Sequence, residues 1–280
     1  MNKSEAGIAV SIATASVPVK RILGRNPGPM TGPGTNSYLI GSDRLSLVDP
    51  GPADDEQLQS FLVAIGDARL ENILITHTHG DHSPGALALQ AETGANLVGL
   101  KAPDVAGHDK TFTPDRQYAD EDVIDCGEYS IRLVATPGHV SNHICFLLKE
   151  EQLLFTGDHI LQGTTPVILP PDGDMSAYLD ALESLLTIPL KALAPGHGAI
   201  MLQPYAEIEK LIAHRLKRER KVVAGLEGLG AVTLDELVLT VYDDVAAQLI
   251  PWAKRTLMAH LIKLERDGRV CCVDELWQIQ

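Results

Sequence analysis

The chain has 280 residues and a formal net charge of −14, with 45% hydrophobic and 21% charged residues. This ordinary globular composition excludes a disordered chain, and no apolar run approaches the roughly 18 residues of a membrane span. The deficit of positive charge disfavours a general nucleic-acid coat, because phosphate binding requires a positive surface. Residues 1–200 hold 12 basic and 25 acidic side chains, whereas residues 201–280 hold 11 and 12, so we expect a domain boundary near position 200.

The first 200 residues are typical of an α/β domain, in which short apolar strands alternate with helices. Helical spacing of apolar residues predicts helices at 58–65, 84–93 and 176–186. Strands are predicted between loops rich in Gly, Pro and Asp, at residues 45–49, 72–76, 96–100, 131–135, 144–149, 152–156 and 190–194.

The remainder of the chain has a different pattern. Residues 205–226 form a long charged helix, and the capping box Thr233–Glu236 opens a second helix. Pro251 stands at the first turn of a third helix, and residues 269–279 alternate as a short pair of strands. Three helices followed by a β-hairpin are typical of a winged-helix domain.

Cysteine usage favours a reducing compartment. The four cysteines form no CxxC pair and no disulfide-scaffold spacing. Residues 7–19 have some features of a secretory signal, but Glu5 precedes them and polar residues interrupt the run. A β-strand accounts for this segment equally well, so we expect a cytoplasmic protein.

A dense set of metal-binding side chains follows the predicted strand at 72–76. His77, His79, Asp81 and His82 place three imidazoles and a carboxylate within six residues. These are ligands for borderline-soft metals such as zinc. An ordinary polar loop is the weaker interpretation, because groups so close together repel or desolvate one another without a cation. The segment therefore predicts a metal site.

Three further candidate ligands each follow an apolar strand. His139 follows the strand at 131–135, and Asp158 and His197 come directly after the strands that end near 156 and 194. Ligands in α/β sheets gather beyond strand ends, and the glycine beside each residue permits a tight turn. We therefore expect these side chains to converge on the first loop.

The order HxHxDH, Gly-His, Gly-Asp, Gly-His resembles the metallo-β-lactamase superfamily. The resemblance implies an αββα sandwich with two metals at its edge, in a catalytic domain at 1–203, followed by a winged-helix-like domain at 204–280. An Asp at position 158, where common β-lactamases have Cys, makes the chain similar to glyoxalase II-like hydrolases. The implied ligands are His77, His79 and His139 for the first metal, Asp81, His82 and His197 for the second, and Asp158 as the bridge.

A narrower resemblance covers nearly the whole chain. The segments 26–31, 34–39 and 163–165, and the tail residues 257–261, resemble the β-lactamase-like protein 2 family. That family includes a metal-dependent endoribonuclease acting on single strands, and related fungal enzymes cleave thioesters of polyketide carriers. The substrate is therefore not carried over with the fold.

The charges of such a site favour hydrolysis. Two divalent ions, two carboxylates and a bridging hydroxide leave a net charge of about +1, which can generate hydroxide near neutral pH and polarise an acyl or phosphoryl oxygen. We expect this hydroxide to be the nucleophile and Asp81 to orient it. Zinc is the expected metal, with iron or manganese as alternatives. A dioxygenase that uses iron on the same fold would have overlapping ligands.

The predicted function is hydrolysis of a small ester, thioester or lactone-type acyl compound, and the alternative is cleavage of single-stranded RNA. An RNA channel needs cations, whereas residues 1–200 carry −13. The basic run at 214–221 points around most of its helix, which leaves a solvated face and a nucleic-acid contact both open. A DNA-binding regulator and a binding module with a vestigial site are weaker interpretations. We expect no membrane partner and no specific DNA, and a homodimer stays open.

Three residues are candidates for substrate contact, each with a structural alternative. Asn36 lies in a segment expected near the metals or serves a turn, and His143 contacts substrate or simply begins a strand. Tyr178 lines the cleft or packs its helix on the sheet. His108 and Asp109 lie in a predicted surface loop, where solvation explains them.

Overall fold

The computed structural model describes residues 5–280. The chain divides into two compact units, each made of several segments. The predicted division between residues 203 and 204 stays a prediction. The first unit comprises Met1–Thr136, Asn142–Pro166 and Ile188–Pro204, and the second comprises Pro137–Ser141, Val167–Thr187 and Tyr205–Gln280.

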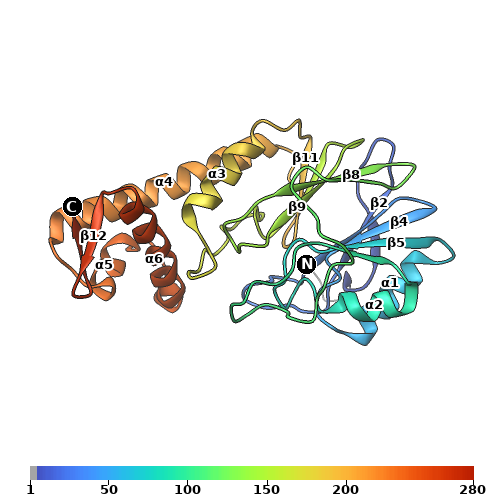
Figure 1. Ribbon diagram of the computed structural model, residues 1–280, viewed down its shortest axis with the longest axis horizontal. Coiled ribbons are helices and arrows are strands. Elements are labelled where there is room, and N and C mark those ends of the chain that lie inside the picture. The colour runs from blue at the N-terminus through green and yellow to red at the C-terminus, as the bar shows by residue number, and fades with distance from the viewer. Residues whose placement is uncertain (1–4) are drawn as a thin grey trace. The chain divides into compact units, whose positions relative to one another are not determined.

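The first unit opens with a six-stranded sheet in the order β1 to β6 (Figure 1). Strands β1 to β4 pair antiparallel, while β4, β5 and β6 are parallel and are connected through α1 (Asp55–Ile65) and α2 (Gly85–Thr93). Parallel pairing places the carboxyl ends of β4 and β5 at the same edge. The strands are β1 (Ala9–Ser11), β2 (Val19–Leu23), β3 (Asn36–Ile40), β4 (Arg44–Val48), β5 (Arg69–Leu74) and β6 (Asn96–Val98).

A second sheet has five strands in the order β11-β10-β9-β8-β7. The predicted hairpin is confirmed, because β9 and β10 pair antiparallel. Strands β10 and β11 are parallel, so Asp158 and His197 follow strand ends at one edge. The strands are β7 (Val123–Asp125), β8 (Ser130–Ala135), β9 (Ile144–Leu148), β10 (Leu153–Gly157) and β11 (Ala192–Pro195).

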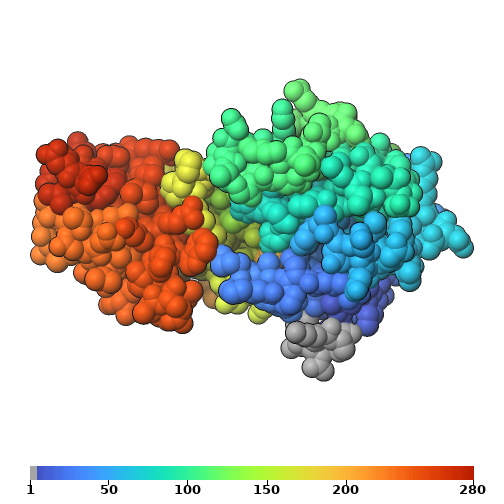
Figure 2. Space-filling view, turned by 90° about the horizontal axis from the view of Figure 1, so that it is seen from below, coloured from blue at the N-terminus to red at the C-terminus, as the bar shows by residue number. Residues whose placement is uncertain are grey.

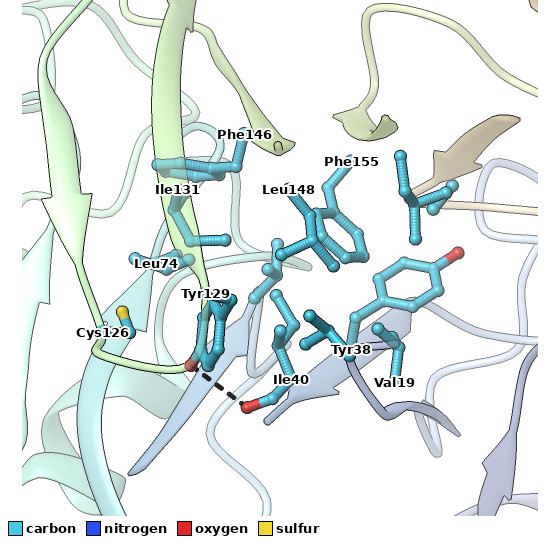
Figure 3. Packing of buried hydrophobic residues seen from close by; sticks show 14 of the residues in the cluster. Val19, Tyr38, Ile40, Leu74, Cys126, Tyr129, Ile131, Phe146, Leu148 and Phe155 are labelled. Atoms are coloured by element: carbon cyan, nitrogen blue, oxygen red, sulfur yellow. Dashed lines mark hydrogen bonds between the residues drawn. The ribbon is translucent and has the colours of Figure 1, made fainter. Parts of the chain in front are cut away.

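Buried side chains of both sheets form one hydrophobic core (Figure 3). The rings of Tyr38 and Phe155 lie 5.0 Å apart, and the Tyr129 hydroxyl donates to the Ile40 carbonyl at 3.2 Å. Burying one such side chain contributes about 2 to 3 kcal/mol. A second cluster, which includes Phe61 of α1 and Leu89 of α2, covers the other face of the first sheet. The predicted mixed α/β sandwich is confirmed.

The second unit contains the predicted winged-helix elements, and its residues Tyr205–Gln280, orange to red in Figure 2, pack into one continuous body. The capping box is confirmed: Thr233 accepts from the backbone of Glu236, whose side chain accepts from Thr233 N. None of the helices within residues 5–280 combines the length and apolar character that crossing a lipid bilayer requires. The elements are α3 (Met175–Leu185), α4 (Pro204–Leu229), α5 (Leu234–Val241), η2 (Ala247–Leu249), α6 (Ile250–Arg266), β12 (Val270–Val273) and β13 (Leu276–Ile279).

The basic run on α4 is partly interior to this unit. Arg215 is 3% exposed, and its guanidinium lies 5.3 Å from the centre of the Tyr178 ring. Arg218 is 8% exposed and donates to Asp244 at 2.8 Å. A charge that is buried and paired inside its own domain is withdrawn from any nucleic-acid surface. Neither a fully solvated face nor a binding stripe therefore describes the whole run.

Candidate metal centre

The seven predicted ligands fall into two groups in the structure. Within each group, one nitrogen or oxygen atom per residue lies within 4.8 Å of the corresponding atoms of the others. The resemblance placed Asp158 between two metals, and the geometry gathers it with the second set. The first ligand group is His77, His79 and His139, and the second ligand group is Asp81, His82, Asp158 and His197.

Asp49 supports this centre and was missed by the sequence analysis. It directly follows β4 and is 1% exposed. Its carboxylate accepts from the backbone N–H of Thr76 at 2.8 Å, from the Thr76 hydroxyl at 2.7 Å, and from Nδ1 of His82 at 2.8 Å. The bond to Nδ1 leaves the lone pair of His82 on Nε2, the arrangement typical of a metal-binding histidine. An acidic residue after an apolar strand and before Pro-Gly was the available signal.

Other imidazoles in the two groups are oriented in the same way. Nδ1 of His139 lies 2.7 Å from the Val167 carbonyl, and Nδ1 of His197 lies 3.3 Å from a backbone carbonyl. Nδ1 of His77 lies 3.1 Å from the hydroxyl of Thr76, which gives its own hydrogen to the Asp49 carboxylate and so accepts from the ring. Each ring therefore keeps Nε2 as its lone-pair nitrogen.

His79 is the exception. Its Nδ1 lies 3.0 Å from Nε2 of His77, so Nδ1 faces the other ligand nitrogens of the first ligand group. The rings of these two residues meet edge to face, with centroids 4.7 Å apart. In the first ligand group, His79 therefore presents Nδ1, whereas His77 and His139 present Nε2.

Nitrogen and oxygen atoms alternate in the second ligand group. Nε2 of His82 lies 3.3 Å from Asp158 Oδ1 and 3.6 Å from Asp81 Oδ2. Nε2 of His197 lies 3.2 Å from Asp81 Oδ2 and 3.4 Å from Asp158 Oδ1. Nε2 of His82 is buried and makes no hydrogen bond within the described part of the chain. A buried lone pair beside two carboxylates is the donor set of a divalent cation, so the residues fit such an ion.

The electrostatics of the second ligand group also favour positive charge. Burial alone lowers the pKa of His82, but the carboxylates of Asp81, Asp158 and Asp49 outweigh it and raise that pKa well above its usual range. Burial raises the pKa of Asp81, yet His82 and His197 hold it at about 2. The carboxylate of Asp81 is therefore ionised at neutral pH and available to a cation.

Two glycines permit the close approach of these loops. Gly157 has φ +45°, and a Cβ there would lie 2.5 Å from Thr76 Oγ1. A Cβ on Gly196 would lie 2.8 Å from Cε1 of His82 and 3.0 Å from Asp158 Oδ1. Any side chain at these positions would push the ligand loops apart.

The three predicted substrate contacts are all buried. Asn36 is 1% exposed, and its Nδ2 donates at 2.9 Å to the backbone carbonyls of Pro195 and Gly198, which flank His197. His143 is fully buried, lies 2.8 Å from a threonine hydroxyl through Nδ1, and accepts from the backbone N–H of Asp158 at 3.2 Å. Tyr178 is fully buried in α3. Direct contact with substrate stays a prediction, and this burial gives it no support.

Comparison with known proteins agrees with this geometry. The family model of the metallo-β-lactamase superfamily matches residues 30–197, and that of the β-lactamase-associated winged-helix domain matches 233–277. A β-lactamase-like protein 2 homologue of Drosophila melanogaster is 34% identical over 94% of this chain and 92% of its own length. An atrochrysone carboxyl ACP thioesterase of Aspergillus fumigatus is 34% identical over 90% of this chain and 82% of its own length.

A solved structure extends the likeness to the fold. A β-lactamase domain protein from Burkholderia ambifaria aligns with a TM-score of 0.80 at 17% identity, covering 98% of this chain and 94% of that protein. The resemblance inferred from the motifs is thus confirmed, together with the class of enzyme. The chain belongs to the metallo-β-lactamase superfamily, carries the winged-helix domain associated with it, and is a hydrolase.

Proposed function

We propose that this hydrolase cleaves a small ester, thioester or lactone-type acyl compound with the help of two divalent cations. The observation that carries the proposal is the second ligand group, in which Nε2 of His82 is buried beside the carboxylates of Asp81 and Asp158. Such an arrangement costs free energy unless positive charge, from a bound cation or from a proton on the imidazole, compensates the carboxylates.

Each ligand group has its own ion in this proposal. The three histidines of the first ligand group would hold one ion, and Asp81, His82 and His197 would hold the other, with Asp158 as a ligand of both. Nitrogen and carboxylate donors suit zinc, with iron and manganese as alternatives. When bound, the ions supply Lewis-acid activation of a water molecule and of the acyl oxygen.

Asp81 is the residue that we assign to orienting the attacking water. Its side chain is 28% exposed, against 13% for Asp158 and 2% for Asp49. Among these three carboxylates Asp81 is therefore the most accessible to a water molecule. Its low pKa keeps the carboxylate ionised and able to accept a hydrogen bond from that water.

The acyl class of substrate rests on the relatives and on charge. One relative at 34% identity is named as a thioesterase that acts on an acyl carrier protein. The alternative substrate, single-stranded RNA, needs exposed cations, and Arg215 and Arg218 of the basic run are buried. An acyl substrate has no such requirement.

One panel of substrates tests the proposal. Purified protein is assayed with acyl thioesters, simple esters, lactones, nitrocefin and labelled single-stranded RNA, each with and without a chelator. We expect chelator-sensitive turnover of thioesters, esters or lactones. Cleavage of RNA alone would reverse the choice of substrate, and turnover that the chelator leaves unchanged would remove the metals from the mechanism.

Three wider predictions accompany this function. The chain acts in the cytoplasm, forms a homodimer or remains a monomer, and divides into functional parts at residues 203 and 204. Expression of 1–203 alone tests the division, and sedimentation of the full chain tests the oligomeric state.

A further inference from the structure

His79 differs from its neighbours in exposure as well as in its ligand nitrogen. It is half-buried, whereas His77 is 1% and His139 5% exposed. The ring of His108 lies against the ring of His79, with centroids 5.0 Å apart and planes tilted by 32°. His108 thus covers the one ligand of this group that the core does not enclose.

The ring of His108 is itself fixed by a chain of hydrogen bonds. Nδ2 of Asn142 donates to Thr78 Oγ1 at 2.8 Å, and the same amide group faces two backbone carbonyls at 3.3 and 3.4 Å, which settles its orientation. Thr78 is fully buried, and its Oγ1 lies 2.8 Å from Nδ1 of His108. Thr78 Oγ1 therefore bonds both Asn142 and Nδ1 of His108, and the tautomer of His108 decides which atom of the second pair donates.

The backbone next to His108 is tied to the ligand loop at two points. The N–H of Asp109 donates to the Thr78 carbonyl at 2.7 Å, and the Asp109 carboxylate accepts from Ser83 Oγ at 2.8 Å. The first of these bonds belongs to a short antiparallel β-bridge between His79 and His108. The pair 108–109, which the sequence analysis ascribed to solvation, instead braces the segment that carries the ligands.

We propose that His108 is a positioning residue that holds the imidazole of His79 with Nδ1 facing the first ligand group, and so strengthens the binding of a divalent cation there. The inference rests on the proposed function, because it takes this group as a set of metal ligands. Groups that orient a metal-binding histidine contribute about 10- to 100-fold in metal affinity. We therefore expect a His108 variant to bind the metal more weakly, and any loss of turnover to follow from that weaker binding.

The test measures the Zn²⁺ affinity of purified full-length variants by competition with a chromophoric chelator. A His197→Ala background keeps the first ligand group intact and breaks the second. In that background we expect His108→Ala to weaken Zn²⁺ binding by about tenfold or more. His108→Phe keeps a ring without the hydrogen bond to Thr78, and His108→Asn keeps a hydrogen-bonding group without the ring, so each recovers part of the loss. Asp104→Ala, an exposed change nearby, leaves the affinity unchanged.

A second background separates positioning from a general loss of structure. In His139→Ala the first ligand group is broken, and there His108→Ala should leave the remaining Zn²⁺ affinity unchanged. An equal loss in both backgrounds, or no loss in either, overturns the role of His108. Wild-type protein that binds no divalent cation overturns the proposed function as well, whereas two bound ions with an unaffected His108→Ala variant overturn this inference alone.

Discussion

Two fully buried histidines, one in each unit, have opposite electrostatic surroundings. His82 lies among three carboxylates, which raise its pKa well above the usual range despite its burial. His260 of α6 is equally buried, but neither of its ring nitrogens makes a hydrogen bond within residues 5–280. Burial lowers the pKa of His260, and the nearby Arg215 and Arg218 lower it further, to about 3.

The surroundings of the two histidines differ in the charge that they favour. The surroundings of His82 favour positive charge, so that a cation or a proton stabilises them. The surroundings of His260 exclude positive charge, and the imidazole stays neutral as part of the packing. Adjacent carboxylates and a fixed Nδ1 make His82 a candidate metal ligand, whereas burial of an imidazole alone does not.

The largest expected effect on activity comes from removing one of the carboxylates that surround His82. Asp81→Ala should lower kcat/KM by about 1,000-fold or more, because it removes both a ligand and the group that orients water. The thermal midpoint should stay close to that of wild type, since Asp81 is partly exposed. Asp67→Ala, an exposed change on the same unit, is the matched control. Retained turnover in Asp81→Ala would place the chemistry elsewhere.

Asp49→Asn tests whether the orientation of His82 matters. The carboxylate accepts three hydrogen bonds, two from Thr76 and one from Nδ1 of His82. Whichever way an amide is turned, one of these donors meets another N–H group. We expect about 10- to 100-fold weaker binding of one Zn²⁺ and a loss of about 2 to 3 kcal/mol in unfolding free energy. Metal titration and urea unfolding measure both, and unchanged values would show that Asp49 has no part in the centre.

The lowered pKa of His260 predicts that the stability of the protein depends on pH. Because the pKa of His260 falls from 6.5 to about 3 on folding, the unfolded chain binds the extra proton between these values. Stability therefore decreases as the pH falls below 6.5, by about 2 kcal/mol at pH 5 from this group. His260→Leu should remove that part of the decrease while changing little at pH 8. If wild type and His260→Leu lose stability identically as the pH falls, the lowered pKa of His260 is contradicted.

The smallest expected effect comes from Glu151. Like other carboxylates with a lowered pKa, it stabilises the fold at neutral pH and loses this effect in acid. Burial raises its pKa, but backbone N–H groups of Ala15, Val17 and Ser16 outweigh this and hold the pKa at about 2. Its stabilisation is present above pH 4.5, the usual pKa, and is lost as the pH falls toward 2. Glu151→Gln should cost about 1 to 2 kcal/mol at pH 7, allowing for solvent screening, with the difference from wild type closing at low pH. A difference in unfolding free energy that stays constant from pH 7 to low pH would contradict this role of the Glu151 carboxylate.

The strand ends and ligand motifs were predictable because each lies within a few residues of sequence. Asp49 and Thr76 meet only because β4 and β5 pair in parallel, with Val48 opposite Leu74. Such a contact depends on register, which hydrophobic pattern alone does not fix across parallel strands. The role of His108 has the same cause, since a loop brings it beside His79 from 29 positions away in the chain.

The basic run on α4 shows a second limit of sequence patterns. Arg215 and Arg218 have the spacing of an exposed charged face, yet both are buried beside tyrosine rings. A guanidinium can be buried when an aromatic face or a carboxylate compensates its charge, and these partners lie far away in sequence.

The central claim is that the two ligand groups bind divalent cations, and metal stoichiometry tests it most directly. Protein stripped with a chelator is titrated with Zn²⁺, and bound metal is measured by elemental analysis after dialysis. We predict two equivalents per wild-type chain and one in either His77→Ala or His82→Ala. Wild-type protein that retains no zinc, iron or manganese under these conditions would contradict the account.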